Sequence, residues 1–225
     1  RLRHKHVLVV GLGGVGAYSA EMLCRAGIGE MTIVDADTVS VSNLNRQLPA
    51  LHSTIGKSKV EVMKERLLDI NPDLKLHGVE LFVRDEKTAE LLEAAPYDYV
   101  VDAIDTLSPK VYLIQQALQR GLRIVSAMGA GGKVDPCQVR VADIAKSTHC
   151  HLAKTVRKRL YRLGVRGGFP VVYSTENVPD EAILIEKDAE INKLSTVGTI
   201  SYMPALFGCT IASVVIRDLL GMPLP

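Results

Sequence analysis

The amino-acid sequence predicts an α/β fold: a Rossmann-like, doubly wound and mainly parallel sheet with helices on both faces. Short apolar runs, typical of buried parallel strands, alternate four times with segments that have a helical period. A glycine-rich loop follows the first apolar run directly, as in nucleotide-binding βαβ units. The chain has 225 residues, of which 47% are hydrophobic, and we expect one domain spanning residues 1–225.

The first strand is expected at His6–Val10, a continuous apolar run that Gly11 closes. The next helix, Val15–Ala26, ends at Gly27, and a second strand follows at Met31–Val34.

Helical spacing is clear in Ser58–Asn71, where apolar residues recur every three or four positions and Pro72 follows. The remaining rounds place strands at Lys75–Val79, Tyr99–Asp102 and Arg123–Met128, and helices at Asp85–Ala95 and Pro109–Arg120.

The regular alternation stops after residue 132. We expect strands at Gln138–Ala142 and Val171–Ser174, a helix at His151–Leu163, and a long connection at Pro179–Val197. An apolar helix, Pro204–Leu220, closes the chain. Its most apolar part is too short to span a bilayer, which favours a buried core helix.

Composition excludes several classes of protein. Aromatic residues are scarce, which argues against a stacking platform for single-stranded nucleic acid. The four cysteines form no disulfide framework, so a cytoplasmic setting without membrane association fits best. We expect Cys24 and Cys209 in the core, Cys137 exposed in a turn and Cys150 in a structural role. The abrupt start of the chain suggests that a segment upstream of it is missing.

A glycine-rich loop, G-x-G-x-x-G, joins the first strand to the next helix. Glycines permit a tight turn and a close approach to phosphate, and the helix N-terminus presents N–H groups to it. Asp35 lies 19 residues beyond the last of these glycines, where a carboxylate can accept ribose hydroxyls. The pattern predicts a nucleotide site formed by Gly11, Gly13, Gly14, Gly16 and Asp35. An NAD-binding enzyme has the same pattern.

Arg46, Lys59 and Asp105 distinguish between classes of nucleotide enzyme. Nucleotidyl transfer needs cations beside the phosphates, whereas hydride transfer does not. All three residues follow strands at one predicted sheet edge, and a carboxylate facing phosphates is a plausible Mg²⁺ ligand. Singly, Arg46 can be explained by a loop salt bridge, Lys59 by a solvated helix face, and Asp105 by a helix cap. Together they predict an ATP–Mg²⁺ site in which these three residues are catalytic.

The motifs resemble those of the ThiF/MoeB superfamily, whose members adenylate the C-termini of ubiquitin-like proteins. The resemblance rests on the glycine loop, on D-x-D-x-V-x-x-S-N-L-N-R-Q from Asp35, on G-K-S-K-V at Gly56–Val60, and on D-A-I-D at Asp102–Asp105. It implies that Asp35 holds the ribose and that Asn43, Arg46 and Lys59 contact the phosphates. It also implies that Asp105 binds Mg²⁺.

The chain is similar over nearly its whole length to a narrower group in the superfamily, the tRNA threonylcarbamoyladenosine dehydratases. The likeness rests on S-A-M-G-A-G-G-K at Ser126–Lys133 and V-A-D-I-A-K at Val141–Lys146, and it weakens after Asn177. MoeB-like and ThiF-like members usually carry two C-x-x-C pairs for a structural zinc. This chain has none, and successive residues at His149–His151 cannot easily converge on one ion, so we expect no zinc.

The expected helix His151–Leu163 carries an apolar stripe opposite a basic face. From Arg140 to Arg166 there are eight Lys or Arg residues and one acid. Such a concentration of charge suits a phosphate backbone, although a solvated face is the alternative. With the resemblance, the pattern predicts tRNA contacts by Lys154, Arg157, Lys158 and Arg162.

The resemblance implies an ATP-dependent dehydration, or cyclisation, of threonylcarbamoyladenosine beside the anticodon of tRNA, through an acyl-adenylate. The alternatives are adenylation of the C-terminus of a ubiquitin-like or sulfur-carrier protein, an NAD-binding dehydrogenase, and a non-catalytic nucleotide-binding scaffold. The resemblance also implies a homodimer, and it admits a sulfur-transfer protein partner and a structural monovalent cation.

Overall fold

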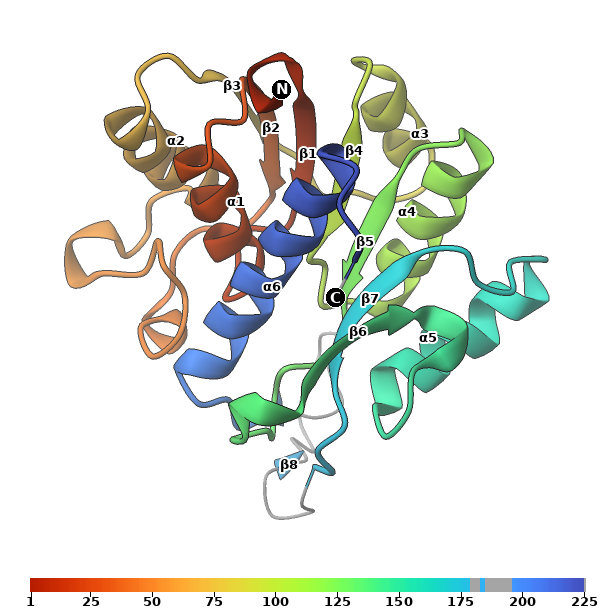
Figure 1. Ribbon diagram of the computed structural model, residues 1–225. Coiled ribbons are helices and arrows are strands. Elements are labelled where there is room, and N and C mark those ends of the chain that lie inside the picture. The colour runs from red at the N-terminus through yellow and green to blue at the C-terminus, as the bar shows by residue number, and fades with distance from the viewer. Residues whose placement is uncertain (179–182, 185–195, 225) are drawn as a thin grey trace.

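A computed structural model describes residues 1–178, 183–184 and 196–224 of the chain (Figure 1). Its main sheet has seven strands in the order β3-β2-β1-β4-β5-β7-β6. Neighbouring strands are parallel except β6 and β7, which are antiparallel. The strands are β1 His6–Val10, β2 Glu30–Asp35, β3 Lys75–Glu80, β4 Tyr99–Asp102, β5 Ile124–Ala127, β6 Val139–Asp143 and β7 Pro170–Ser174. The predicted doubly wound, mainly parallel sheet is confirmed.

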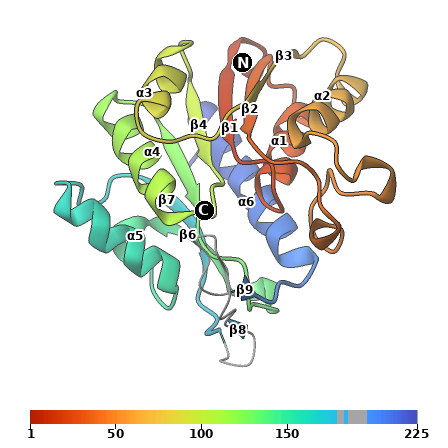
Figure 2. The same cartoon turned by 180° about the vertical axis from the view of Figure 1, so that it is seen from behind.

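Helices cover both faces of this sheet (Figures 1 and 2). On one face lie α1 Gly16–Arg25, α2 Lys59–Ile70 and α6 Tyr202–Leu219. On the other lie α3 Glu86–Glu93, α4 Leu107–Gln119 and α5 His151–Arg162. Strand β1 lies between the two layers. Its residues Val7 and Val9 face the first layer and Leu8 and Val10 the second, which explains why this strand is apolar from Val7 to Val10.

Helix α6 is long and apolar enough to cross a membrane by length and composition alone. In the fold it is a core helix, because Met203, Phe207 and Ile211 are buried against the sheet and α1. Gly208 permits close packing, since a Cβ there would lie 2.5 Å from the Val15 carbonyl oxygen. The opposite side of α6 faces outward, so the expectation that Cys209 lies in the core is wrong: this thiol is exposed.

Predicted and observed boundaries differ by at most about two residues, which is the usual uncertainty of helix and strand ends. Helix α4 begins at Leu107, two residues before the predicted start at Pro109. Proline is tolerated there because the first-turn N–H groups have no intrahelical acceptor. Most of the predicted connection at 179–197 lies outside the described residues. Within it, β8 (Ile183–Leu184) pairs antiparallel with β9 (Thr196–Val197).

Candidate nucleotide-binding site

A large pocket opens at the C-terminal ends of the parallel strands. The loops after β1, β2, β4 and β5 and the first residues of α5 line it. Strands β1 and β4 are neighbours in the middle of the sheet, where the order of the strands reverses. Crevices at this position are where open α/β sheets bind their ligands.

Two glycines of the loop after β1 are required by the protein itself. Gly11 has a φ of +94°, and a Cβ on it would lie 2.7 Å from the Ala103 carbonyl oxygen. A Cβ on Gly16 would lie 1.8 Å from the Gly11 carbonyl oxygen. Gly16 does not line the pocket, so its role is to let the loop and α1 pack closely.

Gly13 differs from these two, because it lines the pocket and has room for a side chain. A Cβ on Gly13 would only touch the Gln47 side chain, at 3.6 Å, an ordinary van der Waals distance. The fold therefore does not require glycine here. Glycine at this position would instead let a ligand approach the backbone closely. Such an approach is typical of loops that bind phosphate.

The carboxylate of Asp35, at the end of β2, lies beside this loop. Its Oδ2 accepts a hydrogen bond from the Leu12 N–H at 2.6 Å, and its Oδ1 accepts one from the Asp37 N–H at 2.8 Å. Each carboxylate oxygen can accept a further hydrogen bond, and Asp35 is only half-buried. The site can therefore receive ribose hydroxyls at Asp35.

Asn43 and Arg46 lie on the pocket wall in the loop between β2 and α2. Asn43 accepts a hydrogen bond from the Ser40 N–H at 3.1 Å, which orders the loop. Arg46 donates from Nη1 to the Ser42 carbonyl and to Asn45 Oδ1, both at 2.8 Å. Within the described part of the chain, no carboxylate pairs with Arg46, so the loop salt bridge considered above is not seen there.

Lys59, in the first turn of α2, is 4% exposed, which excludes the alternative of a solvated helix residue. Its Nζ lies 2.8 Å from Asp37 Oδ2, while the Asp37 side chain is 69% exposed. Both residues line the pocket. The structure therefore places the Lys59 ammonium at the nucleotide pocket, already paired with a carboxylate.

Asp105 is an exposed residue of the pocket wall in the loop after β4, three residues beyond the end of that strand. It is not the cap of α4, because that position belongs to Thr106. Asp105 thus lines the same pocket as Gly11, Gly13 and Gly14 of the glycine loop.

A buried charged cluster that the sequence analysis did not assign lies beneath Asp105. Asp102 Oδ2 lies 2.6 Å from Lys110 Nζ and accepts a hydrogen bond from Ser126 Oγ at 2.5 Å. All three residues are fully buried, and Asp102 Oδ1 accepts from the Ile104 N–H. The cluster thus joins β4, α4 and β5 immediately below the loop that carries Asp105.

A signal for this cluster exists in the sequence. Lys110 falls on the apolar stripe of its helix with Leu113, Ile114 and Ala117. A lysine on such a stripe must have a buried acceptor, and Asp102 at the end of a fully buried strand is a candidate.

Lys133, in the motif after β5, is a second lysine without an assigned role. It is 2% exposed, lines the pocket, and donates from Nζ to the Glu176 carbonyl. Burial lowers the pKa of Lys133, and electrostatic interactions with Cys150 and Glu176 partly oppose this. The Glu176 carboxylate in turn accepts from the Val134 and Asp135 N–H groups, so this cluster holds the loop after β5 in place.

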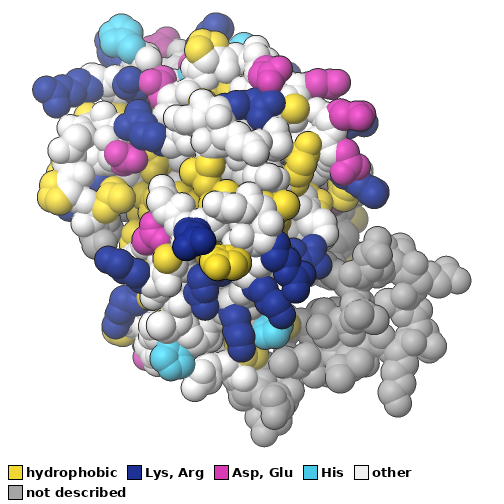
Figure 3. Space-filling view, turned by 90° about the vertical axis from the view of Figure 1, so that its right-hand side faces the viewer, with side chains coloured by type: hydrophobic (Ala, Val, Ile, Leu, Met, Phe, Trp, Pro, Cys, Tyr) yellow, Lys and Arg dark blue, Asp and Glu magenta, His cyan; other side chains and the backbone are white. Residues whose placement is uncertain are grey.

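Helix α5 begins at the pocket, since Cys150, His151 and Leu152 line it. Lys154, Lys158 and Arg162 follow at four-residue spacing and are exposed. Figure 3 faces this side of the molecule and shows Lys and Arg side chains gathered over its lower part.

Arg157, which we grouped with these residues, is placed differently. Its Nη1 donates to the Ser147 carbonyl at 2.9 Å and to the Ser147 hydroxyl at 2.8 Å, and the residue is half-buried. Arg157 therefore anchors α5 to the turn before it.

The segment His149–His151 forms no metal-binding cluster in the structure. Cys150 is buried, whereas the histidines on either side are exposed. Among the described residues, the one group of His, Cys and acidic side chains close enough to hold a metal lies elsewhere.

Comparison with known proteins places this geometry in a family. The ThiF family matches residues 1–225. A protein named tRNA threonylcarbamoyladenosine dehydratase from Bacillus subtilis is 36% identical to the chain, over 97% of the chain and 88% of the relative. A protein of the same name from Haemophilus influenzae is 37% identical, over 98% of the chain and 87% of the relative. A crystal structure of the Escherichia coli enzyme of this name, TcdA, in complex with ATP, has a TM-score of 0.88 at 36% identity, over 98% of this chain and 87% of that one.

Proposed function

The chain belongs to the ThiF family, and within that family we propose that it is an ATP-dependent tRNA threonylcarbamoyladenosine dehydratase. The observation that carries the proposal is the juxtaposition of two features. A phosphate-binding loop with nearby cations and a carboxylate forms one pocket, and an exposed basic helix starts at the rim of the same pocket. The relatives of that name match nearly the whole chain, including the basic helix.

In the proposed reaction, the threonylcarbamoyl carboxylate of the modified base attacks the α-phosphorus of ATP. The products are an acyl-adenylate and pyrophosphate. The neighbouring carbamoyl group then closes onto the activated carbonyl, loses its proton and expels AMP, so a ring forms. Because AMP is a good leaving group, the protein mainly has to position the reactants and stabilise charge.

Each group in the pocket has a place in this scheme. The loop Gly11–Gly14 cradles the phosphates, and Asp35 accepts the ribose hydroxyls. Arg46 and Lys59 stabilise the negative charge that moves toward pyrophosphate. Asp105 is the proposed ligand for Mg²⁺, which would neutralise charge on the phosphate oxygens.

We assign tRNA contacts to the exposed stripe of α5, formed by Lys154, Lys158 and Arg162. A polyanion that lies along this helix reaches the pocket at its N-terminal end, where His151 lies on the wall. Phosphate contacts of this kind fix position without reading sequence. Arg157 supports the helix from beneath and leaves this set.

The proposal is tested by ATP–pyrophosphate exchange with two acceptors. We expect exchange to rise with tRNA that carries threonylcarbamoyladenosine, and to stay at background with unmodified tRNA. A ubiquitin-like protein ending in Gly-Gly is the acceptor for the alternative reaction at the same pocket. Stimulation by that protein, and none by modified tRNA, would establish the alternative.

A second prediction concerns the basic stripe. Replacing Lys154, Lys158 and Arg162 together by Glu should weaken tRNA binding and flatten its salt dependence. We expect the slope of log K against log salt to fall by about 0.7–0.9 for each phosphate that the protein no longer neutralises. Binding is measured over a series of salt concentrations. The matched control replaces three exposed basic residues elsewhere, Arg1, Arg3 and Lys87, by Glu, and an equal fall in slope there would refute the assignment.

A further inference from the structure

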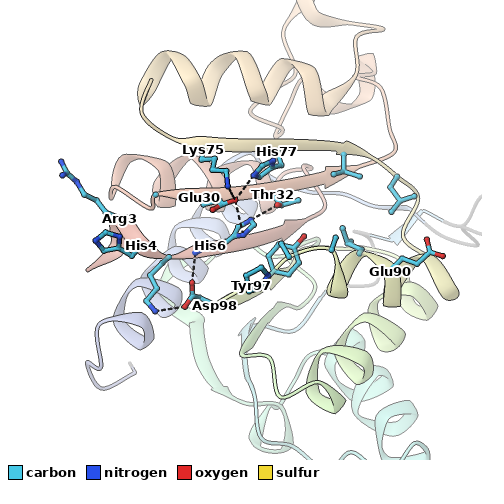
Figure 4. A pocket seen from close by; sticks show the side chains of 18 of the residues that line it. Arg3, His4, His6, Glu30, Thr32, Lys75, His77, Glu90, Tyr97 and Asp98 are labelled. Atoms are coloured by element: carbon cyan, nitrogen blue, oxygen red, sulfur yellow. Dashed lines mark hydrogen bonds and ion pairs between the residues drawn. The ribbon is translucent and has the colours of Figure 1, made fainter.

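A cluster of two histidines and a glutamate lies at the opposite edge of the sheet from the nucleotide pocket. His6, Glu30 and His77 come from the adjacent strands β1, β2 and β3, near the start of β1 and β2, and they border a separate pocket (Figure 4). The reaction proposed above does not use them.

The strand register fixes their arrangement. His6 pairs with Glu30, and Thr32 pairs with His77, in parallel ladders. Paired residues point to the same face of a sheet, as do residues two apart on one strand. The backbone therefore brings the two imidazoles to either side of the Glu30 carboxylate.

The distances match those of a metal site. His77 Nε2 lies 2.9 Å and His6 Nδ1 3.7 Å from the same oxygen of Glu30, Oε1. One ligand atom from each residue lies within 4.8 Å of the others. Donor atoms around a tetrahedral zinc are roughly 3.3 Å apart, given Zn–N and Zn–O bonds of about 2.0–2.2 Å. Closing the difference requires rotation of the His77 and Glu30 side chains, which are 45% and 28% exposed.

The second nitrogen of His6 is already held in place. His6 Nε2 is 2.9 Å from Thr32 Oγ1, and the ring packs edge-on against Tyr97 at a centroid distance of 4.7 Å. This leaves Nδ1 directed to Glu30. Metal-bound histidines typically have their other ring nitrogen fixed by such a partner, which sets the tautomer and orientation of the ring.

The Glu30 carboxylate already pairs with a cation, the ammonium group of Lys75. Lys75 Nζ lies 2.8 Å from Glu30 Oε1, and the Lys75 side chain is 67% exposed. A flexible, exposed lysine can swing into solvent when a divalent ion takes its place.

We propose that His6 Nδ1, His77 Nε2 and the Glu30 carboxylate form a binding site for a divalent transition metal of the zinc type. Two imidazoles and one carboxylate suit Zn²⁺, and three protein ligands leave a fourth position open to water in the adjoining pocket. From the sequence we expect no zinc, because the chain lacks suitably spaced cysteines. The site proposed here differs from that expectation, since its ligands are two histidines and a glutamate. A bound ion would link three strands of the parallel sheet at the edge away from the nucleotide pocket.

The test is direct titration of metal-stripped protein, without nucleotide or tRNA, with Zn²⁺ alone. We expect one equivalent per chain to bind. At about 100 times its dissociation constant, the ion should raise Tm by roughly 5–10 °C, since ligands stabilise the state that they bind. Because His77 is exposed, His77→Gln should fold normally, and it should weaken Zn²⁺ binding by about tenfold or more and abolish most of the Tm shift.

His52→Gln is the matched control, because His52 is an exposed histidine remote from the cluster and should bind Zn²⁺ like the wild type. Thr32→Val should weaken binding about 10–100-fold, although it removes no ligand. The proposal is overturned if the wild type takes up no Zn²⁺, or if His77→Gln binds it as tightly as the wild type. Neither readout depends on catalysis, so failure here leaves the proposed tRNA activity untouched.

Discussion

Replacing Asp105 or Arg46 by alanine should lower the rate of adenylation by about 10²–10³-fold while the fold is retained. Both side chains lie on the wall of the nucleotide pocket, and neither belongs to the hydrophobic core. Arg46 engages its Nη1 within its own loop, and in the described part of the chain its Nη2 and Nε have no hydrogen-bond partner. Removing either side chain therefore takes away charge stabilisation and little packing.

The measurement is ATP–pyrophosphate exchange with modified tRNA, together with the free energy of unfolding. Asp69→Ala and Arg25→Ala are matched controls, because both residues are exposed on helices away from the pocket. We expect these controls to retain near-normal exchange. Near-normal exchange by Asp105→Ala and Arg46→Ala as well would remove the roles assigned to both residues.

The second large effect is expected at the buried pair of Lys110 and Asp102. Lys110→Met should lower the free energy of unfolding by about 3–5 kcal/mol, because it leaves a carboxylate buried without its cation. The double variant Lys110→Met with Asp102→Asn should be less destabilised than the single one. The asparagine carries no charge and can still accept from Ile104 and donate to Ser126.

Chemical denaturation of Lys110→Met, of Asp102→Asn alone and of the double variant gives the coupling energy of the pair. Lys64→Met serves as the control, since Lys64 is 41% exposed and lies 3.9 Å from Glu61 in a surface pair. We expect that change to stay within about 0.5 kcal/mol. If Lys110→Met is as mild as the control, or if adding Asp102→Asn makes it worse, the pair is not the stabilising unit described above.

Local patterns were sufficient to predict most of the fold. The apolar run of β1, the helical spacing in α2 and the glycine after α1 are properties of neighbouring residues, and each specifies its own element. The exposure of Cys209 could not be obtained this way. It depends on which side of α6 meets α1, and an almost uniformly apolar helix does not reveal this.

The candidate site was predicted less completely, for a similar reason. Sequence motifs identified Asp35, Arg46 and Asp105, because loops after parallel strands converge on one sheet edge. Lys59 pairs with the side chain of Asp37, 22 residues away, and Arg157 donates to the Ser147 carbonyl in the turn before α5. No periodic pattern in the sequence encodes either contact. The homodimer, the sulfur-transfer partner and the monovalent cation stay predictions from the resemblance.

Asp35 has a consequence for the thermodynamics of nucleotide binding. Its carboxylate ties the glycine loop, through Leu12, to the start of the next loop, through Asp37. Both segments are thus immobilised when the protein folds, and the entropic penalty of ordering them does not fall on the association step. An Asp35→Ala variant would therefore lose the proposed ribose contact and would also leave the glycine loop less ordered. Its binding entropy should become more unfavourable, a signature that separates preorganisation from the loss of a single hydrogen bond.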